Sequence, residues 1–299
     1  MNILLLTVGV FSGLSHSIYS AVSKSLLKHR ISEPFLFFLY ISILQAVITP
    51  LLWLFVKPAV PPIPGWTPLL LAGITGVIAF MFLYLALSSG DASSVMPIMG
   101  SKVIFAGFLA IFMLNEKHSW TIYGAAILVA ISVGMLSYSP SARGKRKFSG
   151  RPIVLMILCS IVFAFTDNYI TRSLKYIDSY NFMVYYNLII GLGSLAIIPY
   201  IKKKNVLLLL PVQVLWWSLV SAIFLVVATL LLTVLFKLAD GVVIPNILAS
   251  TRGIFIVIIS AVLSHRGSTL LETQTWQIYL LRLVASSLII LSIWITLSK

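Results

Sequence analysis

The stretch VMPIMGSKVIFAGFLAIFML (residues 95–114) places a lysine, Lys102, in the middle of otherwise uncharged residues. A second stretch, VVIPNILASTRGIFIVIISAVL (242–263), places Arg252 in the same way. Because a charge at the centre of a bilayer costs at least ~2.5–3.5 kcal/mol, each cation predicts a polar cavity between helices. The two cations are 150 positions apart in a chain of 299 residues, which predicts a duplicated helix bundle with one cation in each copy.

The composition predicts an all-α polytopic membrane protein embedded in a lipid bilayer. Hydrophobic residues make up 60% of the chain and charged residues only 9%, against about 25% charged in soluble domains. The apolar runs are unbroken, which favours helices over the alternating strands of a membrane barrel. Short connections rich in Gly, Pro, Asp and Ser separate ten predicted spans: 2–23, 34–56, 67–88, 93–114, 119–138, 153–173, 180–200, 214–236, 242–264 and 275–298.

Several functional classes are excluded by the distribution of charge and cysteine. The net charge is +14, but the basic residues cluster at the ends of apolar segments, as topogenic charges do, so nucleic acid is not an expected partner. Cys159 is the single cysteine, which excludes an intrachain disulfide. No motif for a metal, a cofactor or a catalytic nucleophile is present in the sequence, and neither a metal nor a cofactor is expected. Residues 2–23 run on as a full-length span and are expected to be retained as the first helix.

The two halves of the sequence resemble each other. SSGDASSVMPIMGSKVIFAGF (88–108) aligns with KLADGVVIPNILASTRGIFIV (237–257). With a slip of one residue, the alignment places Lys102 over Arg252 and Pro97 near Pro245. We therefore predict two five-helix repeats, 1–138 and 153–299, joined by a basic linker at 139–152. Five spans per repeat is an odd number, so the second copy crosses the bilayer in the opposite direction, and inverted repeats of this kind support transport by alternating access.

The chain resembles the ten-span EamA branch of the drug/metabolite transporter superfamily. The resemblance is carried by LYLALSSGDASSVMPIMGSKVIFAGFLAIFMLNEKHSWTIYGAAILVAISVGML (83–136), with its small residues, an early proline in the fourth span, and Glu116 at the end of that span. In the second half, Arg266 stands where the acidic residue is expected. The resemblance implies a secondary transporter that exports or exchanges a small metabolite through a central cavity. Because the sequence shows neither a transit peptide nor a soluble tail, a bacterial inner membrane is the expected location.

A more distant resemblance bears on the substrate. Plastid sugar-phosphate translocators and nucleotide-sugar transporters of the same superfamily carry anion-binding cations on their fourth and ninth helices, which are the helices of Lys102 and Arg252. The phosphate translocators have a Lys-Arg pair on the ninth helix, whereas this chain has Thr251-Arg252. The resemblance therefore implies an anion rather than a phosphate in particular.

Charge counting leads to the same class of substrate. Of seven acidic residues, only Asp167 falls inside a predicted span, so a cavity that contains Lys102 and Arg252 is expected to be positive. The sequence thus predicts a transporter, not an enzyme, whose small-molecule substrate carries an anionic group. Two alternatives remain open: an exporter of amino acids or drugs, and an intramembrane enzyme acting on lipid headgroups, for which His16 and Asp167 are the available bases.

Further residues are candidates for the site. Ser101, Thr251 and Asn246 could donate hydrogen bonds to the substrate or join helices. Pro97 and Pro245 are candidate hinges or first-turn prolines. Asp167 could neutralise Lys102 or Arg252, carry a coupled proton, or pair with Arg172. His16 is a candidate for proton coupling, or a neutral hydrogen-bonded histidine.

The loops predict the orientation in the membrane. About eleven Lys and Arg residues fall on the side of the 139–152 linker and about six on the side of both termini. The positive-inside rule therefore predicts that the termini lie outside the cytoplasm.

Overall fold

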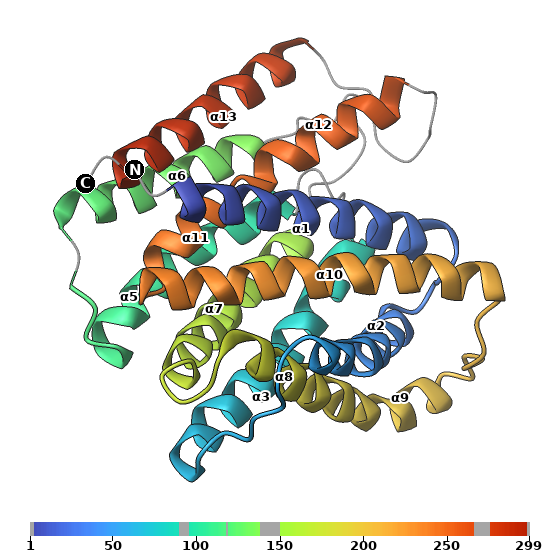
Figure 1. The fold of residues 1–299 in the computed structure, drawn as a ribbon. Helices are drawn as coiled ribbons and strands as arrows, with labels where there is room; N and C mark the ends of the chain where they lie inside the picture. The colour runs from blue at the N-terminus through green and yellow to red at the C-terminus, as the bar shows by residue number, and fades with distance from the viewer. Residues whose placement is uncertain (1–2, 90–95, 118, 138–149, 266–275, 298–299) are drawn as a thin grey trace.

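A computed structural model describes residues 3–89, 96–117, 119–137, 150–265 and 276–297, and its regular structure in these ranges is entirely helical (Figure 1). The long apolar runs account for this, because a helix satisfies the backbone hydrogen bonds of a segment that lies in lipid. The α-helices are α1 (Ile3–His29), α2 (Pro34–Ile48), α3 (Ile63–Ser89), α5 (Lys102–Met113), α6 (Trp120–Ser137), α7 (Gly150–Ser173), α8 (Ser179–Ser194), α9 (Ile198–Lys203), α10 (Val212–Ala239), α11 (Val243–Ala249), α12 (Arg252–His265) and α13 (Trp276–Leu297). Three 3-10 segments are η1 (Thr49–Leu54), η2 (Met96–Ser101) and η3 (Leu195–Ile197).

The protein is a multi-pass membrane protein. Six helical segments among the described residues are long and apolar enough to cross a bilayer, and they occupy the first, second, third, sixth, seventh and eighth predicted spans. The other four predicted spans correspond to shorter apolar helices: Ile98–Met113, Trp120–Ser132, Val243–Ile259 and Leu283–Thr296.

Both spans that carry a buried cation change their helical geometry next to that cation. In the fourth span, η2 changes to α5 at Lys102, and in the ninth span, α11 ends at Ala249 before α12 begins at Arg252. Each break follows a proline, Pro97 or Pro245, and a proline removes a backbone donor and resists a continuous helix. As a result each cation is the first residue of a new helix.

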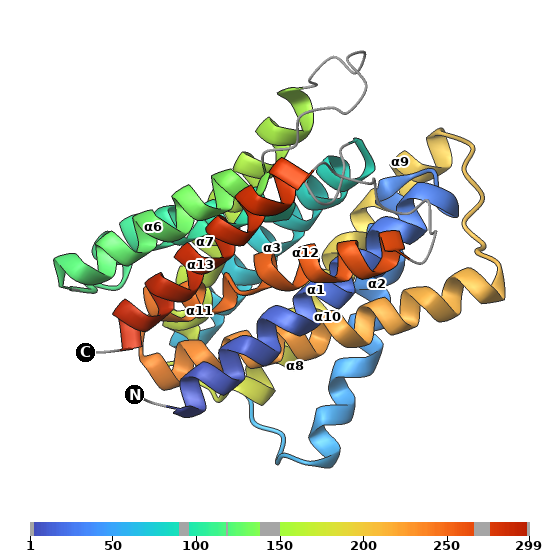
Figure 2. The same ribbon diagram turned by 90° about the horizontal axis from the view of Figure 1, so that it is seen from above.

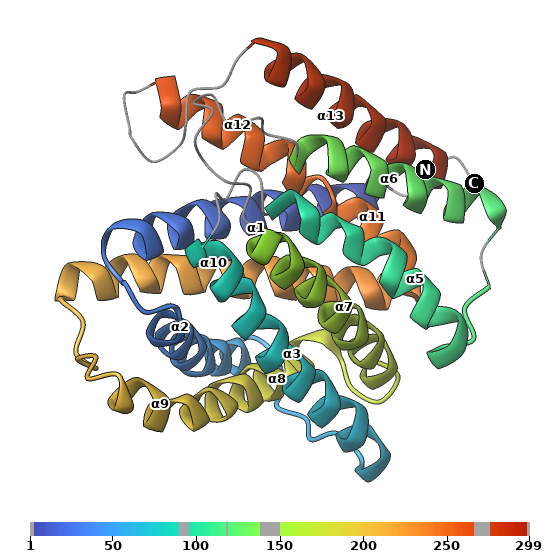
Figure 3. The ribbon, with the colours of Figure 1, turned by 180° about the vertical axis from the view of Figure 1, so that it is seen from behind.

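The helices of the two halves pack against one another in matched pairs. α1 runs along α10, and α3 runs along α7 (Figures 1 and 2). α2 packs against α8, and α6 packs against α13, as the view from behind shows (Figure 3). The first turn of α1 and the last turn of α13 lie at the same end of the bundle (Figures 1 and 2).

Lysines tie the ends of long helices together within each half. Lys24, near the end of α1, donates from Nζ to the carbonyl oxygen of Leu87 in α3 at 2.7 Å. Lys237, near the end of α10, donates in the same way to the carbonyl oxygen of Leu174, just after α7. Cations at these positions satisfy carbonyl groups that a helix end leaves without an intrahelical partner.

Candidate functional site

A buried ion pair lies at the centre of the bundle. Lys102, the first residue of α5, reaches Asp167 in α7 with an Nζ–Oδ2 distance of 2.7 Å, and each side chain is only 4% exposed. The lysine also lies over the ring of Phe163, with Nζ 5.8 Å from the ring centroid. Of the partners left open for Asp167 by the sequence, the structure thus selects Lys102 over Arg172.

Asn246 extends this pair to the second half of the chain. Its side-chain amide donates to Asp167 Oδ2 at 2.8 Å and to the carbonyl oxygen of Val242 at 3.0 Å. Asn246 lies in α11, so the carboxylate joins the fourth, sixth and ninth predicted spans. A buried carboxylate is stabilised by this combination of opposite charge and hydrogen bonding.

Arg252, the first residue of α12, reaches the same region from the opposite side. Its guanidinium donates to the carbonyl oxygen of Met99 in η2 at 3.0 Å. The Arg252 carbonyl oxygen accepts a hydrogen bond from Ser17 of α1 at 2.8 Å. Ion pairing with a carboxylate is found for Lys102 but not for Arg252 within the described ranges.

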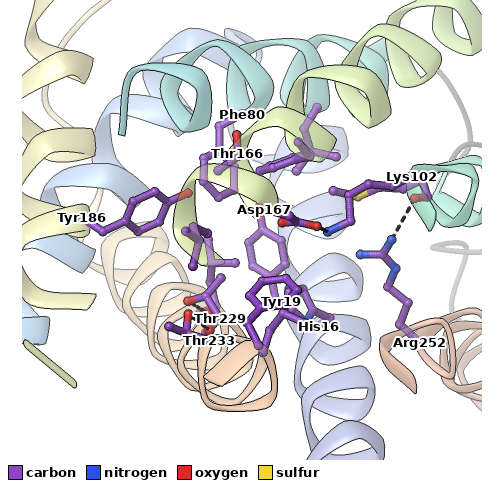
Figure 4. A pocket seen from close by; sticks show the side chains of 17 residues that line it. His16, Tyr19, Phe80, Lys102, Thr166, Asp167, Tyr186, Thr229, Thr233 and Arg252 are labelled. Carbon is purple, nitrogen blue, oxygen red and sulfur yellow. Dashed lines mark hydrogen bonds and ion pairs between the residues drawn. The ribbon is translucent and has the colours of Figure 1, made fainter. Parts of the chain in front are cut away.

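These charged groups line one pocket (Figure 4). His16 of α1 lies beside them, and its Nδ1 is 3.0 Å from the carbonyl oxygen of Ser12. On the far side from Arg252, Tyr186 of α8 and the hydroxyls of Thr229 and Thr233 in α10 face the pocket (Figure 4). The full lining comprises His16, Tyr19, Phe80, Leu83, Met99, Lys102, Phe163, Thr166, Asp167, Ile170, Tyr186, Leu225, Thr229, Leu232, Thr233, Phe236 and Arg252.

The pocket combines a charged end with an apolar and aromatic body. Tyr19 and Tyr84 meet through their hydroxyls at 2.6 Å, and Tyr84 packs on Phe80 with the ring centroids 6.1 Å apart. This wall suits an apolar or aromatic portion of a solute, while the cations suit a charged one. The cavity volume is about 50 Å³, which leaves room for a few water molecules.

A hydrogen bond links the two halves at the start of α11. The Glu116 side chain, after α5, accepts the backbone N–H of Val242 with Oε1 at 2.6 Å. The neighbouring Gly241 allows this approach, because a Cβ there would lie 2.4 Å from the same oxygen. The acidic residue at the end of the fourth predicted span therefore holds the start of α11.

Not every predicted site residue faces the pocket. Thr251 bonds the carbonyl oxygen of Leu248 at 2.9 Å, and the Ser101 hydroxyl is buried without a partner among the described residues. Pro245 is buried inside α11. Pro97 lies in η2, but its side chain is outside the described part of the chain.

Several residues of the pocket are absent from the sequence-based prediction. Thr166, Thr229 and Thr233 are examples, and their signal in the sequence is weak. Thr229 and Thr233 each bond a carbonyl oxygen four residues earlier, at 2.7 Å. Threonines in membrane helices commonly do this whether or not they face a cavity, so only the packing of α10 reveals their role.

Comparison with known proteins finds a family match in the first half of the chain. Residues 3–138 match the model of the EamA-like transporter family. This segment is therefore similar to EamA-like transporters. This family is part of the drug/metabolite transporter superfamily, and its members are transporters rather than enzymes. The resemblance predicted from 83–136 is thereby confirmed.

The fold is shared with a solved structure. A protein described only as "Crystal structure of protein" superposes with a TM-score of 0.66 at 12% identity, over 99% of this chain and 96% of that chain. At this identity the likeness concerns the fold alone, and it extends through both halves. No curated protein matches the sequence.

Proposed function

We propose that this EamA-like protein is a secondary transporter that moves a small organic anion, or a solute with an anionic group, through the central pocket. The observation that supports this proposal most directly is the environment of Arg252. It is a buried guanidinium in a pocket wall that donates to a backbone carbonyl and makes no direct ion pair with a carboxylate among the described residues. A planar guanidinium binds carboxylates and phosphates in a bidentate geometry.

The charge balance of the pocket supports an anion. The charged residues that line it are Lys102, Arg252 and Asp167, which gives a formal charge of +1 with His16 neutral. Lys102 is offset by Asp167 at 2.7 Å. Asp167 cannot neutralise both cations, so one positive charge remains in surplus, and a solute anion would relieve it.

The positions of the cations add to this attraction. Lys102 and Arg252 are the first residues of α5 and α12. Opening of the turns that precede them would expose two helix N-termini, which carry a partial positive charge. Half-helices that start at midplane and direct their N-termini to an anionic substrate recur in secondary transporters. Ser101 and Thr251 precede the cations and Asn246 contacts Asp167, so we retain all three as candidate substrate-binding residues after rearrangement.

Alternating access is the mechanism that we propose. The matched packing of α1 with α10 and of α3 with α7 is the pattern that two inverted five-helix repeats, 1–138 and 153–299, would produce. The small volume of the pocket and the Glu116 contact between the halves support a contracted state of the site. Breaks after Pro97 and Pro245 would then serve as hinges when one end opens.

The decisive experiment measures binding and flux in the Arg252→Gln variant. Purified protein is first screened by thermal shift against carboxylates and phosphate esters, since a ligand at 100 times its Kd adds about 2.7 kcal/mol of stability. Uptake of each hit is then measured in proteoliposomes. Loss of a buried charge that pairs with a ligand costs about 2–5 kcal/mol, so affinity should fall about 30-fold to several-thousand-fold.

Arg172→Gln is the matched control, because Arg172 is exposed near the end of α7. It removes the same charge and should leave binding and flux unchanged. Substrate-free Arg252→Gln should melt at or above the wild-type temperature, since an unpaired buried charge is removed. If Arg252→Gln unfolds while Arg172→Gln does not, the role of Arg252 is structural. If Arg252→Gln takes up the anion as wild type does, the proposal is rejected.

A zwitterionic solute is the second candidate, and Asp167 is the observation that favours it. The carboxylate lines the same pocket as Arg252. An amino acid could therefore place its carboxylate on Arg252 and its ammonium group on Asp167, with Lys102 displaced. The aromatic wall would hold its side chain.

A further inference from the structure

A second cavity, separate from the central pocket, opens between the end of α1 and the start of α10. It has a volume of about 410 Å³ and is lined by Ala21, Val22, Ser25, Leu26, Arg30, Gln213, Val214 and Trp217. At its base the two helices are joined by the hydroxyls of Ser23 and Ser221 at 2.9 Å. The groove is thus a feature of the α1–α10 junction, which runs along one side of the bundle (Figure 1).

We propose that this groove binds an anionic phospholipid, with the phosphate at Arg30 and an acyl chain between α1 and α10. The apolar part of the groove comes from Val22, Leu26 and Val214, which suits a hydrocarbon chain. Trp217 is 48% exposed, and tryptophans at span ends sit at the level of the lipid headgroups. The groove therefore has an acyl-chain portion and a headgroup portion in the order that a bilayer leaflet requires.

The charge at the headgroup end is complementary to an anion. α1 ends in Lys28 and His29, next to Arg30, and α9, which precedes α10, ends in Lys202 and Lys203. Glu33, an acidic residue at this end, already pairs through its Oε2 with Lys204 Nζ at 2.9 Å. An anionic headgroup in this region meets a positive surface, which is worth about 1 kcal/mol per Lys or Arg near a membrane.

The start of α10 adds backbone donors. Its N-cap is Pro211, whose side chain makes no capping hydrogen bond. The N–H groups of Val214 and Leu215 bond the Pro211 carbonyl oxygen at 2.9 and 3.0 Å. Those of Val212 and Gln213 come before them, at the helix N-terminus, where backbone donors favour anions. Gln213, in this first turn, lines the groove together with Arg30.

The test compares lipid retention by native mass spectrometry of the full-length protein, extracted from vesicles of phosphatidylglycerol and phosphatidylcholine in equal amounts. We expect preferential retention of phosphatidylglycerol, reduced about fivefold by Arg30→Gln. Ser25→Phe fills the groove without changing the charge and should reduce retention as well. Lys57→Gln, at an exposed residue outside the groove, is the control and should retain the lipid as wild type does.

Two results would overturn the proposal. Equal retention in Arg30→Gln, Ser25→Phe and wild type would place the lipid elsewhere. Stabilisation of the protein by glycerol 3-phosphate or inorganic phosphate, to the same extent as by phosphatidylglycerol and with the same loss in Arg30→Gln, would identify a soluble phosphate site. Because neither readout depends on the central pocket, the outcome is independent of the transport proposal.

Discussion

Asp167 is the residue at which the two candidate substrates have opposite requirements. Its carboxylate is held by Lys102 at 2.7 Å and by Asn246 at 2.8 Å. In Asp167→Asn, Lys102 loses its counter-ion, and leaving a buried charge without a partner costs about 3–5 kcal/mol. We expect the substrate-free variant to melt below wild type and a carboxylate ligand to stabilise it more than it stabilises wild type.

The same variant distinguishes the zwitterion from the anion. An amino acid that uses Asp167 for its ammonium group should lose affinity in Asp167→Asn, whereas an anion should gain affinity. The double variant Lys102→Met, Asp167→Asn removes both charges and should recover most of the lost stability, which a thermal-shift double-mutant cycle measures. If the double variant melts as low as Asp167→Asn, the unpaired charge of Lys102 is not the cause of the lost stability.

At the residue scale, sequence analysis could identify the charges but not their partners. Lys102, Arg252 and Asp167 stand out because each is ionisable within an apolar span. The distance that joins Lys102 to Asp167 depends on how α5 packs on α7, which periodicity does not specify. The pocket threonines are hidden for a related reason, since their local hydrogen bonds look the same in any membrane helix.

At the scale of elements, α1 packs closely against the turn between α11 and α12 in the ninth span. A Cβ on Gly13 would lie 2.2 Å from Thr251 Oγ1 and 2.9 Å from the Arg252 backbone nitrogen. Gly13→Ala should therefore push α1 away from the start of α12 and move Arg252. Overpacking of this kind costs about 1–3 kcal/mol, and ligand binding should fall with it.

Gly124→Ala is the control for this prediction. Gly124 also lies inside a helix, α6, but a Cβ there meets nothing within 4 Å. Melting temperature and ligand affinity should both fall in Gly13→Ala and stay at the wild-type level in Gly124→Ala. Wild-type behaviour of Gly13→Ala would mean that the break tolerates a shift of α1.

At the scale of elements, the sequence predicted where the spans lie better than it predicted where the helix geometry changes within a span. The six long spans agree with helices because unbroken apolar runs favour one state throughout. The fourth and ninth spans are equally apolar on average, yet they change helix type or stop at Lys102 and Ala249. Hydropathy averages over the break, while the prolines that precede it mark where it falls.

At the scale of the whole molecule, the orientation in the membrane follows from which loops share an end. The first turn of α1 and the last turn of α13 lie together (Figures 1 and 2), which requires an even number of crossings between them. Alignment of the halves suggested this arrangement from sequence. The pairing of α1 with α10 and of α3 with α7 could not be predicted, because it joins residues about two hundred or one hundred positions apart.

Cysteine labelling tests the orientation without altering any charge. In a Cys159→Ser background, Val60→Cys probes the connection between η1 and α3, and Leu207→Cys probes the connection between α9 and α10; both side chains are exposed, at 72% and 81%. Leu207 follows Lys202, Lys203 and Lys204, so the positive-inside rule places it in the cytoplasm of a bacterial cell and Val60 outside. An impermeant maleimide should label Val60→Cys in intact cells, and Leu207→Cys only after permeabilisation. The reverse pattern would place both termini in the cytoplasm and would mean that insertion of the first helix outweighs the charge of the later loops.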